Sequence, residues 1–162
     1  MMGTSAGQIR KVLTDLPIPQ PWDRRRFVDA VAALRGRPIT LIAAPLTGVL
    51  DSPCGLWLVR EHDDVIIHEG ATSEYHRDQI VCHELGHMVL GHDRSGPDAS
   101  EADPMLRHAL PDLDPATVRT VLGRSGYGNR LEREAELFAT MVMTAAAPRP
   151  PQNLRNVLFR QQ

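Results

Sequence analysis

The feature that most constrains this chain is the stretch His83-Glu84-Leu85-Gly86-His87. On an α-helix, residues four positions apart lie on the same face, so His83 and His87 can present two imidazole nitrogens to one metal ion. Glu84, beside the first histidine, is then placed to act as a general base on a water molecule at that metal. A catalytic zinc ion usually takes three protein ligands, and one helix supplies only two. The fold must therefore bring a third ligand to this helix from another element.

Two groups of residues C-terminal to this helix could supply the third ligand. His92 is close in sequence and is one alternative, but its spacing from His83 differs from the HExxHxxGxxH arrangement. A histidine at a helix end also often only caps carbonyl groups. The other alternative is a carboxylate from a second helix, further along the chain, which holds three glutamates: Glu132, Glu134 and Glu136. Such a helix, packed beside the first, would complete a site of two histidines and one glutamate.

Among these glutamates, the helical repeat favours Glu132. Glu132 and Glu136 lie four residues apart and share one helical face. The same face carries Ala135 and Ala139, whose small side chains would let two helices approach closely. This arrangement allows Glu132 to bind the metal while Glu136 orients a ligand histidine from outside. Glu134 is the second choice among the three.

The rest of the chain alternates between apolar helical patterns and short β-branched runs. Helices are predicted over residues 8–16, 24–35, 75–90 and 131–147, with two shorter ones near 105–110 and 115–122. Strands are predicted over residues 38–43, 56–60 and 64–68. The short connection between the last two strands favours an antiparallel hairpin. These elements predict an α+β fold, in which a small three-stranded, mainly antiparallel sheet packs on the helix of His83 and the helix of Glu132.

Length and composition predict one domain with charges in near balance. We expect an N-terminal arm over residues 1–22, the domain over 23–147 and a tail over 148–162, with 93–129 forming an insert or lid. The chain has 18 basic and 20 acidic residues, a net charge of −2, which gives it no general affinity for nucleic acid or for an anionic membrane.

The two cysteines and the N-terminal residues indicate a cytoplasmic protein. Cys54 and Cys82 belong to no CxxC pair and do not form a disulfide framework, so both are expected to be reduced. Residues 1–20 lack the apolar core of a signal peptide, and no stretch of the sequence reaches membrane-spanning length.

Three stretches of the sequence resemble one family, the ImmA/IrrE-like metallo-endopeptidases. They are the His83–His87 motif, its continuation Met88-Val89-Leu90-Gly91-His92, and the downstream pattern Glu132-x-x-Ala135-x-x-Phe138-Ala139. Residues 76–82 and 54–57 are similar to an actinobacterial branch of this family. The resemblance implies that zinc binds to His83, His87 and Glu132 and that Glu84 is the general base. The chain departs from the commoner form through its longer segment between the last histidine and Glu132, and through a glutamate at position 136.

The resemblance also implies a function. A member of this family would be a zinc-dependent endopeptidase that cleaves or inactivates a helix-turn-helix transcriptional repressor, with no direct contact to nucleic acid. The competing hypothesis is a zinc-stabilised binding module that sequesters a regulator without proteolysis. Hydrolysis also requires a donor for the oxyanion, for which the sequence offers four candidates: His76, His108, Arg124 and Tyr127.

Overall fold

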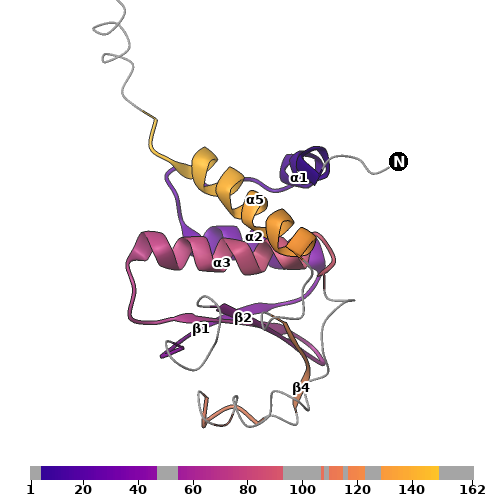
Figure 1. Ribbon diagram of the computed structural model, residues 1–162, viewed down its shortest axis with the longest axis vertical. Helices are drawn as coiled ribbons and strands as arrows, with labels where there is room; N and C mark the ends of the chain where they lie inside the picture. The colour runs from indigo at the N-terminus through magenta and orange to yellow at the C-terminus, as the bar shows by residue number, and fades with distance from the viewer. Residues whose placement is uncertain are drawn as a thin grey trace, which may run out of the picture.

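The computed structural model describes residues 5–46, 55–92, 107, 110–114, 117–122 and 129–149. The described elements are α1 (Ser5–Thr14), α2 (Arg24–Arg35), β1 (Ile39–Ala44), β2 (Gly55–Arg60), β3 (Asp64–Glu69), α3 (Glu74–Val89), β4 (Val118–Leu122) and α5 (Asn129–Ala146). Figure 1 shows the labelled helices on one side of the sheet, with α5 crossing α3. The α+β fold class expected from the sequence is confirmed. None of the helices in the described ranges is long and apolar enough to cross a membrane.

Within the described residues the sheet has four strands in the order β1-β3-β2-β4. The predicted hairpin is confirmed, because β2 and β3 pair antiparallel with Trp57 opposite Ile66. β1 lies parallel to β3, and β4 lies antiparallel to β2, so the sheet is mixed but mainly antiparallel.

One prediction for this region is wrong, because residues 118–122 form a strand and not part of the helix predicted over 115–122. The strand contains β-branched residues, and its backbone forms hydrogen bonds with β2. Local helical preference carries no information about this pairing with a distant strand. Of the helix predicted near 105–110, only Arg107 and Leu110 lie within the described residues. Most of the expected insert, 93–129, and of the tail, 148–162, lies outside the described residues.

Side-chain and glycine caps define the ends of the central helices. At the start of α2 the Asp23 carboxylate accepts a hydrogen bond from the backbone N–H of Arg26 at 3.0 Å. The helix ends at Gly36, whose φ of 66° is a left-handed conformation that favours glycine. At the start of α3, Ser73 accepts from the backbone N–H of His76 at 3.1 Å. The Ser73 cap determines where the helix with the two histidines begins.

The two inner strands are buried on both faces of the sheet. On the helix side Trp57 and Ile66 join the main core with residues of the helices, including Ile9 of α1, which is fully buried. The opposite face carries a second apolar cluster around Leu58 and Ile67. The segment predicted as an N-terminal arm therefore contributes a side chain to the main core through α1. This double burial holds β2 and β3 in register beneath α3.

α3 and α5 approach each other closely at Gly86. A Cβ atom at this position would lie 3.0 Å from the Cδ1 of Phe138 and 3.2 Å from the Cα of Ala135. Both α5 residues are fully buried. Ala135 therefore allows the close approach that the sequence predicted for it, but only because its neighbour on α3 is a glycine.

A buried carboxylate at the start of β3 links four elements. Asp64 is fully buried, and its Oδ1 accepts a hydrogen bond from the indole Nε1 of Trp57 at 3.1 Å. Its Oδ2 accepts from the Nη2 of Arg35 at 3.1 Å. The same arginine donates from Nη1 to the carbonyl oxygen of Met88 at 2.8 Å. Asp64 thereby joins β3 to β2 and α2, and through Arg35 to the end of α3.

We expect Asp64→Ala to lower the free energy of unfolding by about 3–5 kcal/mol, because it removes the carboxylate that balances the charge of Arg35 and the acceptor of the Trp57 indole. The matched control is Asp63→Ala. Asp63 is the preceding residue and pairs with Arg60 in a partly exposed position, so its loss should cost roughly 1 kcal/mol or less. Urea denaturation of both variants measures the difference. Equal losses would contradict the central role assigned to Asp64.

Candidate metal centre

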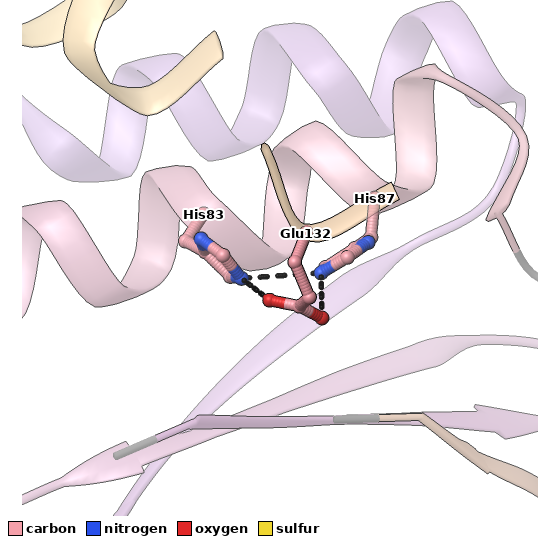
Figure 2. A group of neighbouring side chains, drawn as sticks. All are labelled: His83, His87 and Glu132. Atoms are coloured by element: carbon pink, nitrogen blue, oxygen red, sulfur yellow. Dashed lines mark hydrogen bonds and ion pairs between the residues drawn. The ribbon is translucent and has the colours of Figure 1, made fainter. Parts of the chain in front are cut away.

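Two histidines of α3 and one glutamate of α5 converge on a single point. His83 and His87 lie one helical turn apart, and their Nε2 atoms are 3.1 Å from each other. Glu132, in the first turn of α5, places Oε2 at 3.1 Å from the Nε2 of His83. Its Oε1 lies 3.3 Å from the Nε2 of His87. Figure 2 shows the three side chains pointing toward one another from the two helices.

These three residues have the chemistry and the spacing of a metal site. Two imidazole nitrogens and a carboxylate oxygen are a ligand set that zinc takes in catalytic sites. Ligands held at about 2.0–2.2 Å from one tetrahedral ion lie roughly 3.3–3.6 Å from one another. The separations of 3.1–3.3 Å between these ligand atoms are close to that range. His83, His87 and Glu132 could therefore hold a metal ion with little rearrangement.

The site is buried at its base and open on the side of Glu132. The side chain of His87 is 1% exposed, against 24% for His83 and 44% for Glu132. Burial lowers the pKa of His87, which favours the neutral ring that a metal requires. Burial also opposes a charge on His83, but the hydrogen bond with Glu132 and the charge of Glu84 outweigh it and raise the pKa of His83. Hydrogen bonds with both histidines hold the pKa of Glu132 well below its usual range.

Glu84 lies next to this cluster in an unusual environment. The residue is 3% exposed, and its Oε2 has no hydrogen-bond partner among the described residues. Burial raises the pKa of Glu84 to about 7. A buried carboxylate oxygen without a partner costs stability, and a catalytic role or a bound ion is among the reasons for which proteins retain such a group.

Gly55, the first residue of β2, makes room for the Glu84 carboxyl group. A Cβ atom at this position would lie 2.7 Å from the Oε1 of Glu84 and 2.8 Å from the Cγ2 of Ile80. The start of the strand therefore forms one wall of the space that holds Glu84. Gly55 is not among the site residues predicted from the sequence. The sequence signal for it is a glycine directly before the strand predicted over residues 56–60, because a glycine beside a strand can mark a close approach of another group to the backbone.

The remaining candidates for the third ligand lie beside the centre and contact each other. The Nε2 of His92 is 3.1 Å from the Oε2 of Glu134, and its Nδ1 is 2.8 Å from the Nδ1 of His87. Burial lowers the pKa of His92. Glu136, expected to orient a ligand histidine, is exposed. The side chain that contacts His87 is thus that of His92, which in turn contacts Glu134.

Most of the candidate oxyanion donors lie outside the described residues: His108, Arg124 and Tyr127. His76 is described, and its Nδ1 is 2.9 Å from the hydroxyl oxygen of Thr72 at the start of α3. Cys54 also lies outside the described residues. Cys82 is a free, buried thiol whose pKa is raised by burial, as expected of a small apolar residue within the core.

Comparisons of the chain with models of protein families, with curated proteins and with solved structures found no match.

Proposed function

We propose that this protein is a zinc-dependent endopeptidase. The observation that carries the proposal is the position of Glu84. Its buried carboxyl group, with one oxygen unpartnered among the described residues, adjoins a cluster of two imidazoles and one carboxylate that could hold a metal. A purely structural metal site has no use for such a group, because a structural zinc usually takes four protein ligands and leaves no open position. Three ligands and an adjacent base match a hydrolytic site instead.

In this proposal three residues bind the metal and a fourth transfers a proton. His83, His87 and Glu132 would hold zinc, which when bound supplies Lewis acidity toward water and toward the peptide carbonyl. Glu84 would accept a proton from the attacking water as the water oxygen bonds to the carbonyl carbon. It would then transfer that proton to the amine nitrogen as the C–N bond breaks. Burial raises the pKa of Glu84, which strengthens the carboxylate as a base in the first step.

The proposed substrate, a helix-turn-helix transcriptional repressor, rests on the family resemblance of the motifs and not on the geometry of the site. A repressor encoded near this chain's gene is therefore the first protein to test. The competing hypothesis, a zinc-stabilised module that binds the repressor without cutting it, uses the same three ligands and leaves Glu84 without a role.

We expect the protein to bind one zinc ion per chain and Glu132→Gln to weaken that binding strongly. Loss of a carboxylate that bonds directly to the metal should lower the zinc affinity by more than the roughly 10–100-fold that loss of an outer partner costs. The matched control is Glu136→Gln, an identical change on the exposed part of the same helix, which should leave the affinity within about twofold of wild type. Competition with a chromogenic chelator measures both constants. Wild-type affinity in the Glu132 variant would refute this ligand assignment.

We expect Glu84→Gln to retain zinc and to lose hydrolysis by about 10²–10⁴-fold, because the amide cannot accept the proton of the attacking water. The measurement is mass spectrometry of a candidate repressor, and of a mixed peptide library, after incubation with the zinc-loaded protein. Zinc content is determined in parallel. Cleavage by this variant at the wild-type rate would refute the peptidase proposal. A stable complex of wild-type protein and repressor, with fragments from neither repressor nor peptides, would favour the binding module.

We expect Gly55→Ala to lower the rate of hydrolysis by about 10²-fold while zinc affinity stays within a few-fold of wild type. The new methyl group would displace the Glu84 carboxyl group, and misplacement of a reacting group by about 1 Å has costs of this size. Gly70→Ala is the matched control, because its Cβ would make only ordinary contacts of 3.6 Å or more. Thermal melting of both variants checks that the fold persists. Equal activity in the two variants would show that Gly55 has no role in holding Glu84.

A further inference from the structure

Exposed side chains of α5 border the open side of the candidate metal centre. Glu132 points into the centre and is 44% exposed, and His83 beside it is 24% exposed. Glu136 follows Glu132 by one helical turn, and side chains at this spacing are neighbours, with Cβ atoms about 5–6 Å apart. Glu136 is exposed, whereas Ala135 is buried against Gly86. The helix thus presents one carboxylate to solvent next to the carboxylate that completes the metal site.

The charge of Glu136 acts on the centre itself. Burial lowers the pKa of His83, the hydrogen bond with Glu132 raises it, and the charge of Glu136 raises it further. A carboxylate must be close to the ring to have this effect, because water and salt largely screen charges that lie more than about 10 Å apart. The side chain of Glu136 is therefore near any ligand that binds on the open side of the centre.

No neighbouring cation neutralises Glu136 in the part of the chain that the structure describes. Arg130 pairs with Glu134 at 3.1 Å, and Arg133 forms no ion pair with Glu136 although it lies three residues before it. A carboxylate on the surface does not by itself mark a site, because most acidic residues are exposed. The independent indication of a ligand here is Glu84, whose carboxyl oxygen Oε2 is buried and has no described partner beside the same centre.

The formal charges of a zinc-loaded centre would leave Glu136 uncompensated. With both histidine rings neutral, the carboxylates of Glu132 and Glu84 balance the two positive charges of a zinc ion. Glu136 then adds one negative charge that no described ion pair balances. A peptide bound on the open side meets this charge, which attracts a cationic side chain near the scissile bond and repels an anionic one.

We propose that Glu136 is a specificity-determining residue that favours peptides with arginine or lysine next to the scissile bond. The inference rests on the proposed peptidase function and deepens it, because it names a chemical class of substrate that the metal ligands alone do not distinguish. This class agrees with a repressor as substrate, since proteins that bind DNA carry arginine and lysine side chains that contact phosphates. An exposed ion pair contributes little affinity, so the preference should be modest.

The first test measures peptide binding without cleavage, in zinc-loaded protein that carries Glu84→Gln. The probes are fluorescent peptides that are identical except for one central residue, which is Arg, Lys, Gln or Glu, and fluorescence anisotropy gives their dissociation constants. The Arg and Lys peptides should bind roughly 2–5-fold more tightly than the Gln peptide, and the Glu peptide should bind more weakly. Adding Glu136→Gln should remove these differences. Adding Glu136→Lys should make the Glu peptide the tightest ligand.

The matched control is Asp112→Asn, which also removes one exposed carboxylate. Asp112 precedes Leu113, which packs on the sheet face opposite α3, away from the metal centre. This variant should keep the full preference for the Arg and Lys peptides. Equal binding of the Arg and Gln peptides to the parent protein would overturn the inference, and so would a preference that persists after Glu136→Gln.

The second test compares the kinetics of wild type and Glu136→Gln on a cleaved peptide with arginine next to the scissile bond. The substitution should raise KM by roughly 2–5-fold and leave kcat within about twofold, because an exposed charge pair forms equally in the ground state and the transition state. Raising the ionic strength from about 0.1 M to about 1 M should shrink the difference. A loss confined to kcat would place Glu136 in the chemical step and contradict the inference.

The two tests separate the inference from the proposed function. If the zinc-loaded protein binds the peptides with the expected preference but cleaves none, the role of Glu136 stands and the peptidase proposal fails. If wild type and Glu136→Gln cleave basic and neutral peptides with the same selectivity, the peptidase proposal stands and the role of Glu136 fails.

Discussion

The close packing of α3 against α5 at Gly86 is the constraint on which the candidate site depends. Two histidines on one helix cannot complete a metal site, so the third donor must be held at the right distance by another element. Gly86 and Ala135 provide this distance, because any Cβ on α3 at the contact would press on the backbone of α5. The position of Glu132 in the first turn of α5, one turn before Ala135, follows from that contact. A larger residue at either position would separate the helices, and with them the donors.

Two buried carboxylates show how the fold treats structural and reactive charge differently. Asp64 is fully buried, and its two oxygens accept from Trp57 and Arg35, so its charge is satisfied inside the core. Glu84 is nearly as buried, yet one of its oxygens has no partner among the described residues, and its pKa is raised to about 7. The first arrangement stabilises the joining of elements. The unpartnered oxygen of Glu84 lowers the stability of the fold, and a proton-transfer role for Glu84 would explain why it is retained.

The glutamates of α5 illustrate where local pattern stops being informative. The sequence places Glu132 and Glu136 on one face, which correctly relates them to each other and to Ala135. It does not reveal that Glu136 is exposed while Ala135 and Ala139 are buried. Nor does it reveal that the loop after α3 returns His92 to meet Glu134. Both outcomes depend on the crossing of two helices, and helical periodicity alone carries no information about a crossing.

The sequence by itself determined the elements whose causes are local. Neighbouring residues and backbone geometry account for the β2–β3 hairpin and for the position of His83 and His87 on one helical face. They also account for the helix caps at Asp23, Ser73 and Gly36. Only the tertiary structure decided that residues 118–122 form β4, because that strand depends on pairing with β2 about sixty residues earlier. The tertiary structure also decided the contact of Gly55 with Glu84, and the contacts that connect His87 through His92 to Glu134. These contacts join residues far apart in the chain, and their geometry depends on how the layers pack.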